Sequence, residues 1–312
     1  MDNQFDVVVI GSGPGGYVAA IRAAQLGFKV ACVEKRNTLG GTCLNVGCIP
    51  SKALLQSSEC FAFAKKGAEE QGVSYKNVSF DFAKMMGRKE KIVDGSVKGI
   101  DGLFKKNGIT TVCGKARFIS LDHLEISYDK KTTLLKAKSF VIATGSQPIP
   151  LPFLPFDENF VLSSTGALSL SKIPKKMVVI GAGVIGVEIA SIYNRLGTEI
   201  IIVEMLDRIC PAMDNALGKA LFQSLKKQGL VFHLSSRVTD AEVNKHKVIL
   251  KVETQNETLN LEGNALLVAI GRFPYSEGLG LEKIGVEKSA KGFVLVDSQF
   301  RTSLPHIFAI GD

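Results

Sequence analysis

The chain contains one glycine-rich pattern twice, and this repeat restricts the possible folds more than any other feature. Residues 7–10 form a β-branched run that leads into Gly11-Ser12-Gly13-Pro14-Gly15-Gly16, and a stretch of helical period follows. Residues 178–180 lead into Gly181-Ala182-Gly183-Val184-Ile185-Gly186 in the same way, 170 positions later. A Gly-x-Gly-x-x-Gly motif between an apolar strand and a helix is typical of a βαβ dinucleotide-binding unit. The sequence therefore predicts two such units.

Each glycine of this motif has its own physical role. The first permits a tight turn, the second lets the backbone approach a pyrophosphate, and the third lets the helix pack closely on the strand. The pyrophosphate would then face the positive end of the helix dipole. In the two motifs these positions are Gly11, Gly13 and Gly16, and Gly181, Gly183 and Gly186.

An acidic residue stands 18 positions after the third glycine of each motif, Glu34 in the first and Glu204 in the second. At this distance a carboxylate accepts hydrogen bonds from a ribose hydroxyl. Because a carboxylate repels a 2′-phosphate, we expect the second site to bind NAD rather than NADP. Arg208 is close enough in sequence to favour NADP, so that alternative stays open.

The pattern of segments predicts an α/β fold with two Rossmann-like, doubly wound, three-layer domains. Residues 58–106 have the period of long helices, and residues 109–135 alternate like antiparallel strands. The proline-rich residues 148–155 indicate a linker. We expect the second domain, residues 150–273, to be inserted in the first, which comprises residues 1–149 and a return segment, 274–312.

Composition excludes some classes of function. The formal net charge is +8, but Lys and Arg occur in short scattered clusters without interleaved aromatic residues, which favours a solvated basic surface over a nucleic-acid site. No apolar run approaches the ~18 residues of a membrane span, so we expect no membrane partner. A strand-like segment follows Met1 at once, so we expect no signal or transit peptide and a cytoplasmic location, with the mitochondrial matrix as the alternative.

Cys43 and Cys48 stand five positions apart, directly before a predicted helix that carries Lys52. A cross-link over so short a loop adds little conformational stability. Thiol–disulfide exchange is the favoured use, because helix-start amides and a nearby lysine favour the thiolate. The alternatives are two small buried residues or half of a metal site, for which further Cys or His pairs are missing. We expect the other cysteines to be buried small hydrophobes: Cys32, Cys60, Cys113 and Cys210.

Together these segments resemble the pyridine-nucleotide flavin disulfide reductases along the whole chain, and most closely the branch that oxidises dihydrolipoamide. The resemblance rests on residues 40–55, on Ala143-Thr144-Gly145-Ser146, on Gly271-Arg272 with Pro274, and on the closing Gly311-Asp312. Glutathione reductases usually carry another residue at the position of Ser51. A glutathione- or mercury-reductase and a nucleotide-binding fragment without turnover are the alternatives.

The resemblance implies FAD at the first site, NAD at the second, and a redox disulfide beside the flavin. It implies that Cys43 exchanges with the substrate, that Cys48 lies against the flavin, and that Lys52 sits near the flavin and pairs with Glu188. The implied FAD residues are Gly11, Gly13, Gly16, Glu34, Gly41, Thr42, Lys52, Gly114, Ala116, Thr144, Gly145, Ser146 and Asp312. The implied NAD residues are Gly181, Gly183, Val184, Ile185, Gly186, Glu204, Val238, Ala269, Gly271 and Arg272.

The resemblance further implies lipoyl domains of 2-oxoacid dehydrogenase complexes as partners and a homodimer in the longer protein. A C-terminal dimerisation domain with a His–Glu base is expected to lie outside these 312 residues. We therefore expect little dihydrolipoamide turnover and weakened FAD retention from this chain alone. The chain's own histidines are in no such context and receive no catalytic role: His123, His233, His246 and His306.

The first prediction concerns the state of the two cysteines. Their spacing and the intervening Gly47 predict a disulfide in oxidised protein. Thiol titration of the denatured chain should count two more thiols after reduction than before it. Reaction of all six cysteines without reductant would contradict the redox interpretation.

Overall fold

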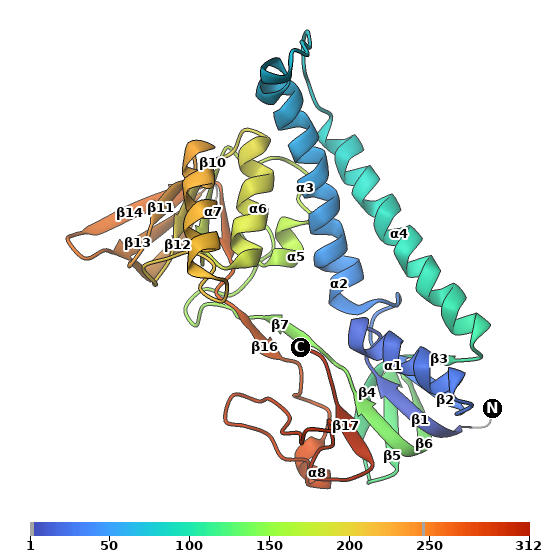
Figure 1. Ribbon diagram of the computed structural model, residues 1–312. Helices are drawn as coiled ribbons and strands as arrows, with labels where there is room; N and C mark the ends of the chain where they lie inside the picture. Colours follow the sequence, from blue (N-terminus) through green and yellow to red (C-terminus); the bar gives the residue numbers. More distant parts are fainter. Residues whose placement is uncertain (1–2, 245–246) are drawn as a thin grey trace. The chain divides into compact units, whose positions relative to one another are not determined.

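The structure is a computed structural model that describes residues 3–244 and 247–312 (Figure 1). Met1 and His246 lie outside the described residues. The chain forms two compact units, each built from separated segments. Unit 1 contains the chain up to Cys48, Val93–Gln147 and Phe273–Asp312, and unit 2 contains Ile49–Ile92 and Pro148–Arg272.

Unit 1 is organised around a mainly parallel sheet with the strand order β3-β2-β1-β6-β5-β4, in which β17 also pairs with β6. Strands β1, β2, β3, β6 and β17 run parallel to one another, whereas β5 pairs antiparallel with both β6 and β4. Its elements are β1 (Gln4–Ile10), α1 (Pro14–Gln25), β2 (Val30–Glu34), α2 (Gly41–Val46), β3 (Thr110–Cys113), β4 (Lys115–Phe118), β5 (His123–Tyr128), β6 (Lys131–Ile142), α8 (Leu281–Ile284) and β17 (Ile307–Ala309).

Strand β6 takes part in both kinds of pairing. Its first half pairs antiparallel with β5, and its second half pairs parallel with β1. The predicted antiparallel region 109–135 is therefore partly wrong, because Thr110–Cys113 forms the parallel edge strand β3 beside β2. Alternation of apolar and polar residues indicates that one face of a strand is buried. It does not indicate whether the neighbouring strand runs parallel or antiparallel.

Unit 2 contains a five-stranded parallel sheet, order β11-β10-β9-β15-β8, and a three-stranded antiparallel sheet, order β12-β13-β14. A short two-stranded sheet, β16-β7, contains two of the four chain segments that pass from one unit to the other. The elements are α3 (Cys48–Ala62), η1 (Phe63–Gly67), η2 (Glu69–Gln71), α4 (Phe82–Lys106, which continues into unit 1), β7 (Ser146–Pro148), β8 (Val161–Leu162), α5 (Ser164–Ala167), β9 (Lys176–Ile180), α6 (Val184–Arg195), β10 (Glu199–Val203), α7 (Asn215–Lys227), β11 (Val231–His233), β12 (Arg237–Val243), β13 (Val248–Glu253), β14 (Thr258–Gly263), β15 (Ala265–Val268) and β16 (Arg272–Pro274).

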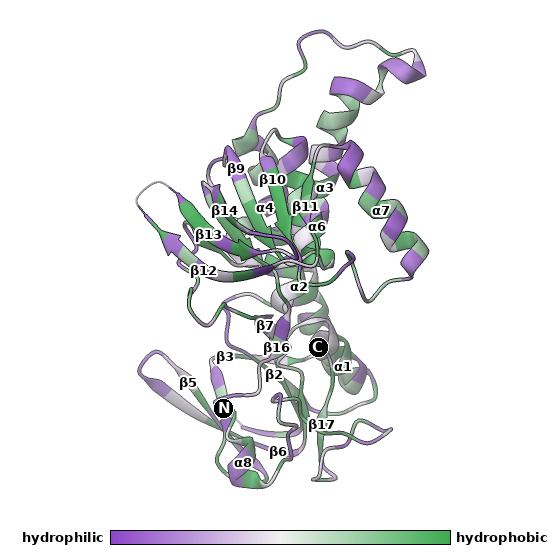
Figure 2. Cartoon of the chain, turned by 90° about the vertical axis from the view of Figure 1, so that its left-hand side faces the viewer, coloured by the Kyte–Doolittle hydropathy of each residue, from purple (hydrophilic) through white to green (hydrophobic). Residues whose placement is uncertain are grey.

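Unit 2 has three layers because successive residues of β9 point to opposite faces of the sheet. Met177 and Val179 are buried in one hydrophobic cluster with side chains of α6 and α7, whereas Val178 and Ile180 are buried in another with β13. The strands of this sheet are mostly coloured hydrophobic in Figure 2, as expected for a parallel sheet covered on both faces. The predicted fold class, α/β with parallel dinucleotide-binding sheets, is confirmed.

Residues 49–92 pack with unit 2, whereas the predicted borders had placed them in the first domain. Leu54 and Met85 belong to the hydrophobic cluster of α6 and β9. The Lys89 side chain is buried, and its Nζ donates to the carbonyl of Leu168 (2.9 Å). The spacing of apolar residues in a helix shows that one face is apolar, but it does not show which unit of the protein packs against that face.

The predicted helical region 58–106 is interrupted. Residues 72–81 contain no helix, and α4 begins at Phe82, where Asp81 Oδ1 accepts a hydrogen bond from the Lys84 N–H (3.0 Å). This is N-cap geometry, in which a side chain satisfies an amide at the helix start. Gly72 ends the preceding turn with a left-handed φ of 76°.

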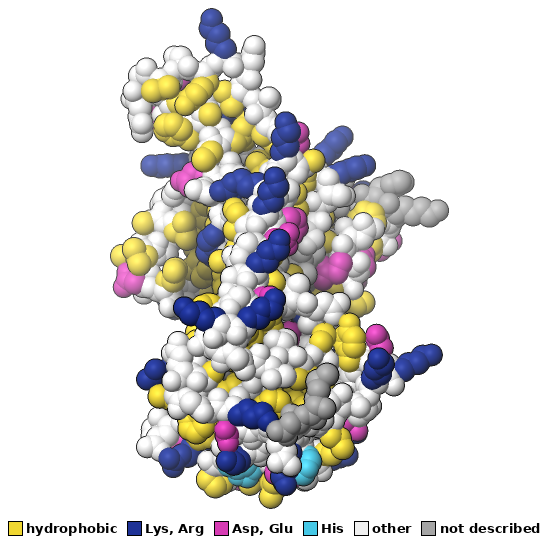
Figure 3. All heavy atoms as spheres, turned by 90° about the vertical axis from the view of Figure 1, so that its right-hand side faces the viewer, with side chains coloured by type: hydrophobic (Ala, Val, Ile, Leu, Met, Phe, Trp, Pro, Cys, Tyr) yellow, Lys and Arg dark blue, Asp and Glu magenta, His cyan; other side chains and the backbone are white. Residues whose placement is uncertain are grey.

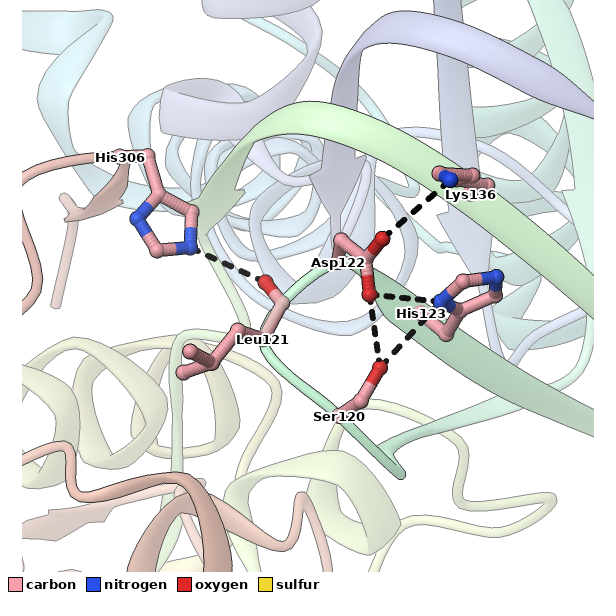
Figure 4. A network of polar contacts seen from close by, with 6 residues as sticks. All are labelled: Ser120, Leu121, Asp122, His123, Lys136 and His306. Carbon is pink, nitrogen blue, oxygen red and sulfur yellow. Dashed lines mark hydrogen bonds and ion pairs between the residues drawn. The ribbon is translucent and has the colours of Figure 1, made fainter.

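His306 attaches the return segment of unit 1 to the turn between β4 and β5 (Figure 4). Its Nε2 contacts the carbonyl oxygen of Leu121 at 3.0 Å. The contact joins two segments that are 185 residues apart in the chain. It fixes the entry to β17, whose partner in the sheet is β6.

A serine, a histidine and an aspartate meet in the same turn. Asp122 Oδ1 contacts His123 Nδ1 (2.7 Å) and accepts from Ser120 Oγ (2.9 Å). The bond from His123 is the largest cause that holds the pKa of Asp122 down, at about 2. Ser120 Oγ also contacts Nδ1 of His123, so both contacts use one ring nitrogen. A Ser–His–Asp proton relay needs both nitrogens, and this group is therefore a turn-stabilising network.

Candidate functional site

The first glycine of each motif is required by the chain's own geometry. Gly11 and Gly181 have left-handed φ angles of 101° and 99°. A Cβ at Gly11 would lie 2.3 Å from the carbonyl oxygen of Ala143, and one at Gly181 would lie 2.4 Å from that of Ala269. In each unit the backbone that leaves the next parallel strand therefore closes tightly on the glycine turn. Ala269 is thus placed directly at the second motif.

The third glycine lets the helix begin against the turn. A Cβ at Gly16 would lie 1.8 Å from the carbonyl oxygen of Gly11, and one at Gly186 would lie 2.2 Å from that of Gly181. Separations below 3.0 Å from backbone atoms cannot be relieved by a side-chain rotation. The starts of α1 and α6 are therefore fixed at the carboxyl ends of β1 and β9.

The second glycine differs, and it is the test of whether a dinucleotide fits. Gly183 has an ordinary φ of −70°, and among the described residues a Cβ there would meet nothing within 4 Å. Gly13 would meet only the Cα of Gly41, at 3.9 Å. The protein's own packing does not require glycine at these positions. Close approach of a ligand to the backbone does require glycine there. We call each glycine loop, together with the helix start that follows it, a cradle: residues 11–16 form the first cradle and residues 181–186 form the second. Both cradles fit a dinucleotide pyrophosphate.

Glu34 and Glu204 are held in the same way in the two units. Glu34 Oε2 accepts from the N–H and Oγ of Ser12 (2.9 and 2.6 Å), and Glu204 Oε2 accepts from the N–H of Ala182 (2.7 Å). The other oxygen of each carboxylate accepts from the N–H two residues further along the chain, at 2.9 Å. Oε1 of each carboxylate accepts only one of the bonds named here and keeps acceptor capacity for a ribose hydroxyl. Sequence reasoning missed this second role, which fixes the glycine loop.

Two helix starts meet in the first cradle. Gly41 is the first residue of α2, and a Cβ there would lie 2.5 Å from the Cα of Gly13, the N-cap of α1. The N–H of Gly40 also donates to the carbonyl of Ser12 (3.0 Å). Thr42 follows as the second residue of α2. Backbone amides from two helices therefore surround one place, which suits an anion such as a pyrophosphate.

The residues predicted near the flavin gather beyond the ends of β6 and β17. Ser146 Oγ donates to the carboxylate of Asp312. Thr144 Oγ1 donates to the carbonyl of Tyr275 (2.6 Å), and the Tyr275 N–H donates to the carbonyl of Gly145 (2.7 Å). The motif after β6 is thereby joined to the return segment. Tyr275 was missed from the sequence because its contacts are long-range and made by the main chain.

Gly114 and Ala116 lie beside the first acidic residue. The Gly114 N–H donates to the Glu34 carbonyl (2.8 Å), and a Cβ at Gly114 would lie 2.7 Å from Ile126. The methyl of Ala116 is buried in the hydrophobic core, so only its backbone can contact an adenine. A cavity of about 270 Å³ opens next to Glu34 and is also lined by Arg36 and by Lys98 and Asp101 of α4.

The residues predicted around the second cradle occupy several loops of unit 2. Val184, which is exposed, and Ile185, which is half-buried, open α6. Val238 in β12 lies two residues after Ser236, whose N–H donates to the backbone carbonyl of Glu204 (2.9 Å), so the start of β12 lies beside the end of β10. Gly271 has a left-handed φ of 129° and leads into Arg272 at the start of β16.

The two candidate redox cysteines are placed by two helices. Cys43 lies half-buried in α2, and Cys48 is exposed as the first residue of α3. Between them a Cβ at Gly47 would lie 3.0 Å from the carbonyl of Thr42, so the turn is tight. Lys52 stands one turn after Cys48 in the same helix. The disulfide between the cysteines stays a prediction.

The predicted ion pair between Lys52 and Glu188 is present. Lys52 Nζ lies 2.6 and 2.8 Å from the two carboxylate oxygens of Glu188 in α6. Ser51 Oγ also donates to Glu188, at 3.4 Å, a contact that sequence reasoning missed. The Glu188 side chain is 24% exposed and that of Lys52 is 59% exposed. The pair is therefore partly screened and accessible to solvent.

The expectation that the other cysteines are buried holds for two of them. Cys32 and Cys210 are buried, and burial raises the pKa of both thiols. Cys60 is exposed and Cys113 is half-buried, so the expectation was wrong there. Cys60 lies on the face of α3 that points away from the core, and a small residue is tolerated on either face. No cluster of three or more metal-ligating side chains occurs in the described ranges 3–244 and 247–312.

The charged side chains do not gather into one patch on the face drawn in Figure 3, where Lys and Arg alternate with acidic and uncharged groups. A helix long and apolar enough to cross a membrane is not found among the described residues.

The glycine geometry gives the second prediction. Gly186→Ala places a methyl against a carbonyl and should lower the free energy of unfolding by about 1–3 kcal/mol. Gly183→Ala, the matched control in the same loop, enters open space; its cost should stay below about 1 kcal/mol while dinucleotide affinity falls. Denaturant unfolding and calorimetric titration with NADH measure the two effects. A stable Gly186→Ala protein, or unchanged NADH affinity in Gly183→Ala, would contradict this assignment.

Comparison with known proteins gives the family. The pyridine nucleotide-disulphide oxidoreductase family matches residues 5–312. The chain is 49% identical to a mitochondrial dihydrolipoyl dehydrogenase of Pisum sativum and 48% identical to a leghemoglobin reductase of Glycine max; the matches cover 99% of this chain and 62% and 60% of those proteins. The HOCl-induced flavoprotein disulfide reductase RclA from Escherichia coli superposes with a TM-score of 0.86 at 28% identity, covering 99% of this chain and 66% of RclA.

The chain thus spans less than two thirds of the length of these relatives. Family membership implies FAD and NAD(H) as cofactors, in agreement with the two cradles. The match, the two repeated cradles and the Cys43/Cys48 segment agree, and the chain belongs to the pyridine nucleotide-disulphide oxidoreductase family.

Proposed function

We propose that this chain carries the dinucleotide-binding and thiol-bearing part of an FAD-dependent dihydrolipoyl dehydrogenase, which oxidises protein-bound dihydrolipoamide to lipoamide and reduces NAD. One observation supports this proposal most strongly. Two dinucleotide cradles of similar geometry occur in the same chain as Cys43 and Cys48, which lie at the starts of α2 and α3. The identity of 46–49% with dihydrolipoyl dehydrogenases, against 28% with RclA, supports this substrate.

Each cradle is assigned one cofactor. The first would hold FAD through Gly11, Gly13, Gly16, Glu34, Gly41, Thr42, Lys52, Gly114, Ala116, Thr144, Gly145, Ser146 and Asp312. The second would hold NAD through Gly181, Gly183, Val184, Ile185, Gly186, Glu204, Val238, Ala269, Gly271 and Arg272. FAD, when bound, supplies two-electron chemistry between the thiol pair and the nicotinamide.

The thiol chemistry belongs to Cys43 and Cys48. A dihydrolipoamide thiolate attacks the Cys43 sulfur, the Cys43–Cys48 bond breaks, and Cys48 leaves as a thiolate. The second lipoyl thiolate then attacks the lipoyl sulfur bound to Cys43, which releases lipoamide and the Cys43 thiolate. Two electrons pass from the substrate to the cysteine pair, and the two substrate thiols lose their protons to a base or to solvent.

Two features of the chain place charge or dipole beside Cys48. Cys48 is the first residue of a 15-residue helix, where the dipole stabilises negative charge. Lys52 adds a positive charge one turn further on and is held by Glu188. Lys52 and Glu188 are therefore assigned to positioning charge beside the thiol pair, with Cys43 and Cys48 as the exchanging groups.

We assign lipoyl domains of 2-oxoacid dehydrogenase complexes as partners and a homodimer as the form of the longer protein. For location the mitochondrial matrix is preferred to the cytoplasm, because the pea relative is named as mitochondrial and the relatives give the cytoplasmic expectation no support. Fractionation of cells that express the tagged protein separates these two locations.

The third prediction tests the reaction itself. Anaerobic addition of dihydrolipoamide to the FAD-loaded chain should reduce the flavin in a single turnover, and Cys43→Ser or Cys48→Ser should abolish that reduction. Cys60→Ser is the matched control, since Cys60 is exposed on α3 and outside the site. Bleaching that persists in Cys43→Ser, or that requires glutathione instead, would overturn the proposed function.

The fourth prediction concerns the choice of nicotinamide cofactor. Glu204 meets a 2′-phosphate with like charge, which should favour NADH over NADPH by about 1–3 kcal/mol. Glu204→Gln should reduce this difference in binding free energy between NADH and NADPH. Glu199→Gln at the opposite end of β10 should leave it unchanged, because that side chain is exposed and pairs with Lys176. Isothermal titration with both cofactors measures the difference, and equal affinities in the unaltered protein would refute the role of Glu204.

A further inference from the structure

A lysine and a tyrosine from distant parts of unit 1 are in close contact at the first cradle. Lys35 follows Glu34 at the end of β2, and its Nζ lies 3.3 Å from the ring centroid of Tyr275. The Tyr275 backbone is fixed by hydrogen bonds to Thr144 and Gly145. Lys35 is an exposed residue, so its ammonium has room to point into solvent. It lies over the ring instead.

The order of the strands shows what this contact crosses. In the sheet, β1 lies between β2 and β6. Lys35 follows β2, whereas Tyr275 is bound to residues that follow β6, so the contact passes over the carboxyl end of β1. That end continues as Gly11-Ser12-Gly13, the floor of the cradle. Two strand spacings amount to about 10 Å, which an extended lysine side chain and a tyrosine ring span together.

We propose that Lys35 and Tyr275 form a clasp across the mouth of the first cradle, which a dinucleotide has to open before its pyrophosphate reaches Gly13. This inference rests on the proposed function, in which the first cradle binds FAD. The pyrophosphate offers the ammonium charged oxygen acceptors in place of a neutral ring face, and charge-assisted hydrogen bonds are stronger than an exposed cation–π contact. The clasp therefore closes in the absence of ligand and opens in its presence.

The strength of such a contact sets the size of the effect. An exposed cation–π pair makes the closed form about two to five times as populated as the open form. When only the open form binds, the observed association rate is reduced by the open fraction. Removal of the clasp should therefore accelerate FAD association by about three- to sixfold. The dissociation rate should not change, because the bound state has no clasp.

The fifth prediction measures this gate. In stopped-flow experiments on the flavin-free 312-residue chain, Tyr275→Leu should bind FAD about three to six times faster than the unaltered protein. Tyr275→Phe keeps the ring face and the main-chain bonds, and its rate should equal that of the unaltered protein. In a Lys35→Met background, Tyr275→Leu should have no further effect, because the partner cation is already gone.

The outcomes separate the two proposals. Absence of any FAD binding by the unaltered chain, as distinct from the weakened retention expected of it, overturns the proposed function, and the gate with it. FAD binding at equal rates in the unaltered and Tyr275→Leu proteins, or the same acceleration in the Lys35→Met background, overturns the clasp alone. An NMR measurement does not need FAD: the ε-CH₂ protons of Lys35 should be shifted upfield by the ring and should lose that shift in Tyr275→Leu. An unshifted signal in the flavin-free protein also overturns the clasp.

Discussion

The contact between the third glycine of each motif and the carbonyl of the first is the constraint on which both units depend. Because Gly16 and Gly186 lack a side chain, α1 and α6 begin directly against the turns at Gly11 and Gly181. Their first-turn amides, which have no acceptor within the helix, then lie at the ends of the strands. Any larger residue at the third position would lift the helix from the sheet and move those amides from the place where a pyrophosphate binds.

The acidic residues add a second constraint to the same turn. Glu34 and Glu204 each hold the amide between the first two glycines with one oxygen and their own following loop with the other. A residue usually discussed for its contact with ribose thus also connects two adjacent strand ends. This dual use explains why the two cradles are alike at the level of single hydrogen bonds, although most of the intervening residues differ.

Local patterns were predictable from the sequence where the interacting residues are close in the chain. The strand, turn and helix of each motif, and the acid that follows, are all contained in about 30 residues. The pairing of Lys52 with Glu188 spans 136 residues and came from the family resemblance rather than from spacing. Helical period could not tell that Leu54 and Met85 join the core of unit 2, nor that Cys60 faces solvent. Tyr275 carried no signal, because its backbone makes the contacts that place it.

The three-segment construction of unit 1 determines the order in which its sheet can be completed. Val8 in β1 pairs with Phe140 in β6, and Phe140 in turn pairs with Ile307 in β17. The whole parallel sheet of unit 2, from β8 to β15, lies between these last two residues in the chain. During synthesis, therefore, every strand of unit 2's parallel sheet leaves the ribosome before unit 1 receives β17. The sheet that starts first still lacks this strand when the other sheet has all of its own, and its β6 edge stays open to other partners in the interval.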